Sequence, residues 1–463
     1  MTLLLKSGTV LIHNDEDNVV PTRADVLLEG DRISKIEATI SPPPSCEVID
    51  CTNKIVSPGF VDTHHHGWQS PFKGLFGDMD LLPYSAISRM KTPTLNLPLI
   101  AGRPSLALFR PAFDPSSRTP QFPLLRRANL RSKFSVETLP DWVIATFEQL
   151  VSSKSLSDPQ TRVQLGFGWD FYFLPKEDIQ TVFRKARSLG SKTITSHFIR
   201  HLLDGDGNSL VAKFEDYGLL LDDMVFSHAG GATAEDIKLI QEASCLISAT
   251  PNTEEAMQVG PTVPFRKELP VINQICSLGV DCHSATTSSL VSEMRLVLQM
   301  ARGRDSEQHI RLGRQPSDLS RKTLEVFNMG TIQGARALRM SQDIGSISVG
   351  KKGDVVIFDA LTPGMYRAAQ RDPVLAIVLH SNIRDVDTVF VDGKVRKRDG
   401  KLLPVNATDW KRNGQDFIES DREIRWAEVM ERVLDMQRRF VTNMSDYNLS
   451  ELESAVSTNW GVK

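Results

Sequence analysis

The chain has 463 residues, of which 40% are hydrophobic and 24% are charged, as is usual for a globular protein with room for one large domain and a smaller one. Its formal net charge of −3 gives no basic surface, which argues against nucleic acid or an anionic membrane as a partner. No apolar run reaches the length of a transmembrane helix, and the first residues lack the features of a signal peptide. The five cysteines show no zinc-finger spacing, so we expect reduced thiols in a cytoplasmic protein.

Short apolar runs separated by turn residues fill positions 1–57, which we therefore expect to form a small β unit. The apolar run that follows ends in His64, His65 and His66. Because side chains alternate along a strand, His64 and His66 are expected to point to one side and His65 to the other. Two imidazoles on one face at a strand end can bind one divalent metal ion. The loop that follows carries Trp68 and Gln69, which we expect near the substrate.

The segment 91–135 differs from its surroundings because prolines interrupt it repeatedly. Proline at this density is unfavourable inside a helix or a central strand, so we expect an irregular segment without a legible strand. A disordered insertion and a segment altered by a gene-model error both remain open.

Strands and helices alternate regularly from position 141 onwards. We expect helices at 142–152, 176–189, 210–217, 233–243, 270–278 and 289–302, and strands at 163–168, 192–197, 224–228, 245–251 and 279–281. This alternation is typical of a parallel sheet. We predict an α/β fold with a (β/α)₈ TIM-type barrel over 58–340, distorted around strands 2 and 3.

The pattern returns to β over 341–405, where Asp392-Gly393 between two apolar runs indicates a hairpin. We expect this segment to complete a composite β-sandwich with residues 1–57. Residues 406–463 are predicted to form a helical tail, with an apolar stripe along a helix over 408–442. The stripe comprises Trp410, Ile424, Trp426, Val429, Val433 and Met436.

Four predicted strands end in residues that can bind a metal: His64 and His66, His197, His228, and Asp281. In a parallel barrel the carboxyl ends of the strands meet at one mouth, so these residues are expected to become neighbours. Imidazoles together with a carboxylate are the ligands of a catalytic zinc or iron site. We therefore expect one divalent metal ion, with zinc preferred over iron.

These motifs resemble the amidohydrolase superfamily on its chlorohydrolase/deaminase branch. The matching segments are 58–66, 68–69, 73–74, 195–197, 226–228, 250–254, 279–281 and 345–359. The resemblance implies a metal-dependent barrel with a composite β-sandwich, and hydrolysis at a carbon that bears nitrogen or chlorine. It implies His64, His66, His197 and Asp281 as metal ligands, and contact of His228 with the metal-bound water or the substrate.

The expected function is hydrolysis of carbon–nitrogen bonds other than peptide bonds in a small molecule, by deamination or by opening a cyclic amide or amidine. A metal-activated water is the expected nucleophile, with Asp281 transferring its proton to the leaving group and His228 orienting it. The partner is a small-molecule substrate, and homo-oligomerisation is left open. A catalytically impaired homologue and a metal-dependent lyase or decarboxylase remain as alternatives.

One position departs from the family pattern. Related deaminases resemble one another in a glutamate three residues after the strand-5 histidine, where this chain has Arg200. A guanidinium cannot accept a proton there, and we expect Arg200 either to bind an anionic substrate group or to face solvent. His283, two residues after Asp281, is a further candidate substrate contact.

Overall fold

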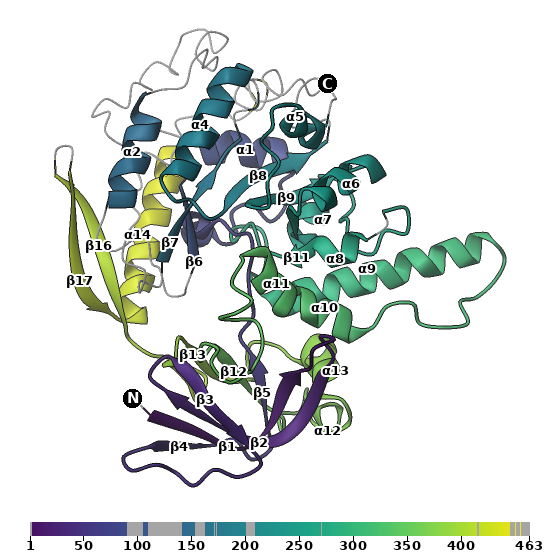
Figure 1. Ribbon diagram of the computed structural model, residues 1–463, viewed down its shortest axis with the longest axis vertical. Coiled ribbons are helices and arrows are strands. Elements are labelled where there is room, and N and C mark those ends of the chain that lie inside the picture. Colours follow the sequence, from purple (N-terminus) through teal and green to yellow (C-terminus); the bar gives the residue numbers. More distant parts are fainter. Residues whose placement is uncertain are drawn as a thin grey trace.

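The computed structural model contains two sheets that carry most of the fold (Figure 1). It describes residues 2–89, 105–109, 141–152, 163–170, 172, 174–200, 209–269, 271–413, 416–444, 450 and 454. A nine-stranded sheet lies at the bottom of the view, and a parallel sheet with its helices lies above it.

The nine-stranded sheet is assembled from the two ends of the chain. Its strands are β1 (Thr2–His13), β2 (Val19–Glu29), β3 (Arg32–Glu37), β4 (Glu47–Asp50), β5 (Lys54–Pro58), β12 (Val355–Asp359), β13 (Val386–Val391), β14 (Lys394–Arg398) and β15 (Lys401–Leu402). The order is β15-β14-β13-β12-β5-β1-β2-β3, and β4 also pairs with β1. The join is made by β5, which runs parallel to β1 and antiparallel to β12. Apolar side chains from both halves, including Leu28, Val56 and Phe390, share one core.

The second sheet is parallel throughout. Its strands are β6 (Ser105–Phe109), β7 (Val163–Gly168), β8 (Ile194–Ile199), β9 (Met224–Gly230), β10 (Leu246–Ala249) and β11 (Cys276–Leu278), in the order β11-β10-β9-β8-β7-β6. Residues 63–66 run beside β11 and continue its pairing through a parallel bridge between His65 and Asp281. The described strands therefore extend over an arc of the predicted barrel, with the chain that leaves β5 at one end.

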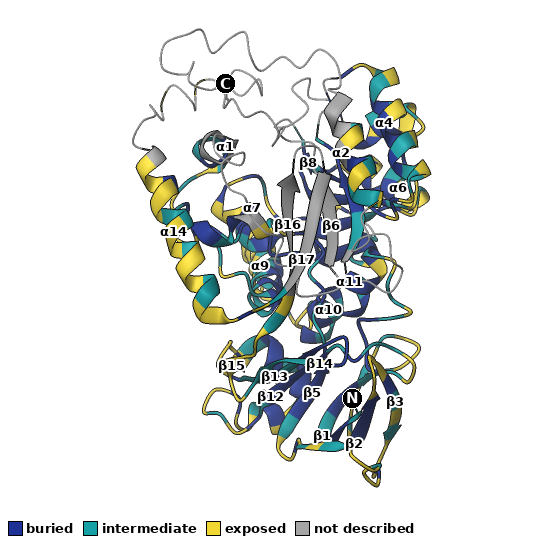
Figure 2. Cartoon of the chain, turned by 90° about the vertical axis from the view of Figure 1, so that its left-hand side faces the viewer, coloured by how far each residue is buried: buried dark blue, intermediate teal, exposed yellow. Residues whose placement is uncertain are grey.

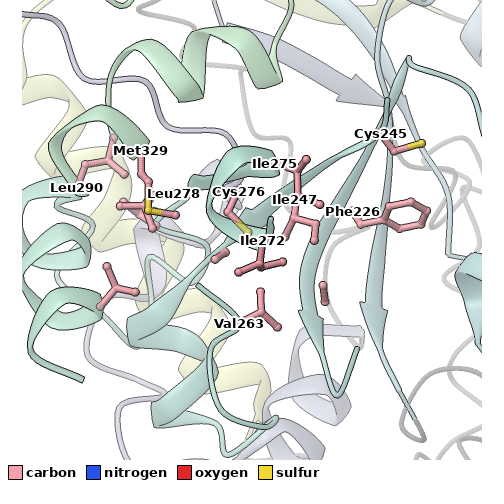
Figure 3. Packing of buried hydrophobic residues seen from close by; sticks show 14 of the residues in the cluster. Phe226, Cys245, Ile247, Val263, Ile272, Ile275, Cys276, Leu278, Leu290 and Met329 are labelled. Carbon is pink, nitrogen blue, oxygen red and sulfur yellow. The ribbon is translucent and has the colours of Figure 1, made fainter. Parts of the chain in front are cut away.

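Helices separate most of these strands. They are α1 (Leu81–Arg89), α2 (Asp141–Ser152), α4 (Lys176–Ser188), α5 (Leu210–Asp216), α6 (Ala234–Glu242), α7 (Pro251–Ala256), α8 (Ile272–Ile275), α9 (Leu290–Arg311), α10 (Thr323–Met329), α11 (Ile332–Ala337), α12 (Ala368–Arg371) and α13 (Pro373–Leu375), together with the 3₁₀ helix η1 (Gly67–Phe72) and a π-helical turn at Ala376–His380. Phe226, Ile247 and Leu278 lie in the largest core, with Ile272 and Leu290 from the helices (Figure 3). This packing fixes the strands whose ends carry the candidate site.

The structure differs from the predicted elements in three regions of the chain. Residues 105–109 form β6 within the segment expected to be irregular, since a short apolar run between two prolines suffices for a strand in the parallel sheet. In place of the helix expected over 270–278 and the strand expected over 279–281, the structure has the short helix α8 followed directly by β11 at Cys276–Leu278. The helix expected over 408–442 is instead a hairpin of β16 (Val405–Asn413) and β17 (Asp416–Ile424), followed by α14 (Trp426–Met444).

The Asn413-Gly414 pair explains the hairpin, because this dipeptide is a strong turn signal between two strands. The predicted apolar stripe consequently does not lie on one helix. Within α14 the inner face includes Phe440, which is buried with its ring centroid 4.5 Å from that of Phe72, whereas Trp426 is exposed. Figure 2 shows the mostly exposed outer side of α14.

Two further sequence-based expectations can be compared with the structure. All five cysteines, each within the described part of the chain, are free, as expected for reduced thiols. No helix in the described ranges is long and apolar enough to cross a membrane.

Glu293 of α9 is fully buried and anchors the start of α7. The main-chain N–H and the side-chain amide of Asn252 both donate to its carboxyl group, at 2.9 and 2.8 Å. Burial raises the pKa of Glu293 to about 8, although the hydrogen bonds from Asn252 oppose this shift.

This buried carboxyl group predicts a decline in stability with rising pH. The unfolded chain releases the proton near the ordinary pKa of 4.5, whereas the folded chain keeps it up to about pH 8, so the free energy of unfolding falls between these values. Glu293→Gln, which imitates the protonated acid, should make this decline shallower in thermal unfolding from pH 5 to 8. Glu307→Gln, at an exposed position on the same helix, is the control. An unchanged slope in Glu293→Gln would contradict the prediction.

Candidate metal centre

The stretch that carries the histidines is held against the ends of the parallel strands. The hydroxyl of Thr63 lies 2.6 Å from that of Ser248 and 2.9 Å from that of Ser277. The N–H of Asp281 donates to the carbonyl of His64 at 2.9 Å, and the N–H of His66 donates to the carbonyl of Asp281 at 3.1 Å. These bonds fix the register that places both histidines next to Asp281.

Five of the predicted site residues meet here. Nε2 of His64 and Nε2 of His66 lie 3.2 and 3.1 Å from Oδ1 of Asp281, and Nε2 of His228 lies 3.8 Å from Oδ2. The His197 ring centroid is 5.0 Å from that of His64 and 5.4 Å from those of His66 and His228. His65 turns the other way and contacts Asp62 at 3.0 Å.

Each of three imidazoles is bonded on its outer nitrogen. Nδ1 of His64 lies 2.9 Å from the hydroxyl of Ser227, and Nδ1 of His228 lies 2.9 Å from the hydroxyl of Thr250. Nδ1 of His197 lies 2.9 Å from Oδ2 of Asp170. Partners at Nδ1 orient an imidazole and leave Nε2 available, as is usual for histidines that bind metal.

The candidate centre combines a neutral imidazole with an ionised carboxylate. Burial lowers the pKa of His64 to about 4, despite the neighbouring Asp281 carboxylate, so its imidazole is neutral at physiological pH. Burial alone would raise the pKa of Asp281, but contacts with His64 and His66 outweigh it and hold this pKa well below its usual range. The result is an ionised carboxylate among imidazoles, with the negative charge facing their ring nitrogens.

Two buried atoms at the centre are suited to binding a cation. Nε2 of His64 and Oδ1 of Asp281 face one another, yet neither has a hydrogen-bond partner among the described residues. A buried polar atom without a partner is costly, whereas a divalent ion would satisfy both lone pairs. Ligand atoms of His64, His66 and His197, and those of His64, His228 and Asp281, form two groups that each lie within 4.8 Å. The donor set therefore suits a divalent metal ion.

The backbone is strained in the last residues of β9 and at Asp281, three residues after β11. His228, Ala229 and Asp281 have φ of 72°, 59° and 48°, in the left-handed region that side chains other than glycine seldom adopt. Such strain is retained where surrounding contacts fix the conformation, and it often accompanies functional geometry.

The other four predicted site residues lie outside this cluster: Trp68, Gln69, His283 and Arg200. Trp68 is the second residue of the 3₁₀ helix η1, and its side chain is outside the described part. Gln69 is fully buried, where it donates to the hydroxyl of Tyr84 and accepts from Ser284 at 3.0 Å. His283 lies beside His65, with ring centroids 5.4 Å apart. Substrate contact for these residues stays a prediction.

Arg200 forms an ion pair with the buried carboxylate of Asp236 on α6. Asp236 also accepts from the main-chain N–H of Thr233 at 2.8 Å, completing the capping box at the start of this helix. The guanidinium therefore links the end of β8 to α6, and an additional contact with substrate stays a prediction.

Sequence reasoning missed the polar groups that surround the imidazoles. Asp170 comes two residues after the apolar strand β7, and an acidic residue shortly after an apolar run is the signal that singled out Asp281 and would also have found Asp170. Ser227, Thr250 and Glu254 were not recognisable in this role, because their contacts depend on how the strand ends pack together.

The chain is similar to known hydrolases and deaminases. Residues 174–396 match the model of the Amidohydrolase family. The chain is 25% identical to the 5-methylthioadenosine/S-adenosylhomocysteine deaminase of Thermococcus kodakarensis over 421 residues, covering 85% of this chain and 94% of that one. It is also 25% identical to the 5′-deoxyadenosine deaminase of Methanothermobacter thermautotrophicus over 412 residues, covering 82% and 90%.

Solved structures show the same fold. An adenosine deaminase from Xanthomonas campestris with bound zinc has a TM-score of 0.68 at 16% identity, covering 95% of this chain and 98% of that one. The atrazine chlorohydrolase of Arthrobacter aurescens TC1, complexed with zinc, has a TM-score of 0.67 at 15% identity, covering 95% and 100%.

The similarity to this family and to these deaminases, together with the histidine–aspartate centre, supports a metal-dependent hydrolase of carbon–nitrogen bonds other than peptide bonds. Across nearly half of its length the chain is similar to the Amidohydrolase family, and most of its length is similar to deaminases. The alternatives of an impaired homologue and of a lyase or decarboxylase are not favoured by these relatives.

Gly279 is the residue whose size controls the approach of His64 to β11. A Cβ atom at this position would lie 2.6 Å from the carbonyl oxygen of His64 and 2.8 Å from its Cβ and N. We predict that Gly279→Ala displaces His64 and lowers the amount of divalent metal bound per chain, measured by elemental analysis of the purified protein.

The matched control is Gly303→Ala in α9, where a Cβ atom would meet nothing within 4 Å. This change should leave metal content unchanged and stabilise the helix by about 0.5–1 kcal/mol. Equal metal content in Gly279→Ala and the unaltered protein would show that the close approach is not required.

Proposed function

We propose that this chain is a zinc-dependent deaminase that replaces the 6-amino group of an adenosine derivative by oxygen and releases ammonia. The observation that carries the proposal is the convergence of His64, His66, His197 and Asp281, with His228 beside them, at the ends of parallel strands. The adenosine-type substrate is supported by the named activities of relatives that align over more than four fifths of the chain.

In this proposal the parallel sheet belongs to a closed (β/α)₈ barrel over 58–340. Residues 1–57 and 341–405 form the composite β-sandwich. The C-terminal segment 406–463 contains α14 and all of the hairpin except its first residue, Val405. His64, His66, His197 and Asp281 hold one metal ion, for which zinc is preferred and iron is the alternative. A bound divalent ion lowers the pKa of water from about 15.7 towards 7 and so supplies a nucleophile at neutral pH.

In this proposal each of the neighbouring side chains has a separate role in the reaction. The Asp281 carboxylate accepts the proton of the attacking water and delivers it to the departing amine, for which its depressed pKa keeps it ionised beforehand. His228, whose Nε2 lies 3.8 Å from Oδ2 of Asp281, orients the water or the substrate. Asp170 keeps Nε2 of His197 aimed at the metal by holding Nδ1.

Related deaminases have a glutamate where this chain has Arg200. Another residue must therefore transfer the proton that a glutamate would carry at this position. The Arg200 guanidinium is paired with Asp236 and cannot accept a proton. The attacking water carries two protons, of which Asp281 passes one to the departing amine. The other is assigned to Nε2 of His228, which accepts it and passes it to the purine ring. Trp68, Gln69 and His283 remain proposed substrate contacts, reached from the loops after the strand ends.

The proposal is tested by ammonia release from the zinc-loaded protein. Purified full-length chain should deaminate 5′-methylthioadenosine, 5′-deoxyadenosine or adenosine, detected by the ultraviolet change from the adenine to the hypoxanthine chromophore and by ammonia in a coupled assay. The double variant His64→Ala/His66→Ala should lose metal and at least 10³-fold of the activity, a loss comparable with removal of other essential catalytic groups. Zinc-loaded protein that leaves all three nucleosides unchanged would overturn the adenosine assignment.

A further inference from the structure

A buried carboxyl group beneath His228 has no part in the mechanism above. Glu254 lies on α7 with 1% of its surface exposed. Its Oε1 accepts the main-chain N–H of Thr250 at 2.8 Å and lies 3.5 Å from Nδ1 of His228. Its Oε2 is buried and has no hydrogen-bond partner among the described residues.

The local fold explains why this group faces the imidazole. β10 ends at Ala249, and α7 begins immediately with Pro251, so Glu254 lies one helical turn after Thr250. The main-chain N–H of Glu254 donates to the carbonyl of Thr250 at 3.0 Å. The carboxyl group consequently folds back over the end of β10, towards the histidine at the end of β9.

Thr250 connects the carboxyl group to the ring. Its hydroxyl oxygen lies 2.9 Å from Nδ1 of His228 and 3.4 Å from Oε1 of Glu254. If the hydroxyl donates towards Glu254, its oxygen accepts from Nδ1–H of His228. A carboxylate on this side favours a proton on Nδ1, which leaves the lone pair of Nε2 facing Asp281.

The charge balance around Glu254 supports the same orientation. The nearby Glu293 is also buried, and burial raises its pKa to about 8, so its carboxyl group is neutral at pH 7. Within the described residues, the ion pair of Glu254 is with His228. Its Oε1 atom is therefore directed at the outer nitrogen of this ring.

We propose that Glu254 is a positioning residue that, through Thr250, fixes the Nδ1–H tautomer and the orientation of His228. Its kinetic consequence rests on the proposed function, whereas its structural consequence does not. A carboxylate behind a histidine typically contributes 10- to 100-fold to the activity or affinity of the site it orients.

The structural consequence is measured without turnover. Protein labelled with ¹⁵N at its histidines and loaded with zinc should show His228 as the Nδ1–H tautomer in long-range ¹⁵N–¹H correlation spectra, assigned by loss of its signals in His228→Asn. Glu254→Gln should convert His228 to the Nε2–H form or to a mixture of tautomers. Thr250→Val should have the same effect, and Thr250→Ser should preserve the original pattern. An unchanged tautomer in both Glu254→Gln and Thr250→Val would overturn the proposal.

The kinetic consequence is measured by a double-mutant cycle with the same nucleoside assay. Glu254→Gln should lower kcat 10- to 100-fold with little change in KM or in metal content, and it should cause no further loss when His228 is already Asn. Glu255→Gln, at the exposed neighbouring position, is the matched control and should stay within twofold of the unaltered protein.

The two proposals fail in different ways. Inactive protein that nevertheless shows the tautomer change would contradict the adenosine deaminase assignment and support the role of Glu254. Active protein in which Glu254→Gln causes the same fold loss with and without His228 would overturn the role of Glu254 alone.

Discussion

The candidate centre depends on the main-chain pairing of the histidine stretch with the end of β11. Two hydrogen bonds, from Asp281 to His64 and from His66 to Asp281, join segments more than 200 residues apart in the chain. Their parallel register places two imidazoles on the same side as the carboxylate, and Gly279 supplies the space that this pairing needs. Without this register the ligands would remain on separate strand ends.

The same constraint explains the position of the nine-stranded sheet. The chain passes directly from β5 into the histidine stretch. The position of the histidines therefore depends on how β5 is fixed within the nine-stranded sheet. Pairing with β1 on one side and β12 on the other provides that anchor, and the N–H of Gly59 continues it by donating to the carbonyl of Asp354 at 2.8 Å. The composite sheet therefore helps to fix the positions of His64 and His66, the first two candidate metal ligands.

The sequence was sufficient to predict features that follow from periodicity and strand ends. Alternating apolar runs identified most strands of the parallel sheet, and His197, His228 and Asp281 were found because each follows such a run. It did not predict β6, whose short apolar run is masked by flanking prolines, or the hairpin before α14, where an Asn-Gly turn outweighed an apparent helical stripe. The roles of Ser227 and Thr250 depend on distances between neighbouring strands, and a sequence pattern carries no information about these distances.

The distribution of carboxylates gives the centre its chemical character. Asp281 faces His64 and His66, Asp170 holds His197, and Glu254 lies behind His228. The cation at Arg200 does not offset this negative charge, because it is already paired with Asp236. Neutral imidazoles supported by carboxylates are stronger donors to a metal than imidazoles alone, and a divalent cation in turn removes the repulsion between the carboxylates. The arrangement therefore favours a bound metal ion as an integral part of the folded centre.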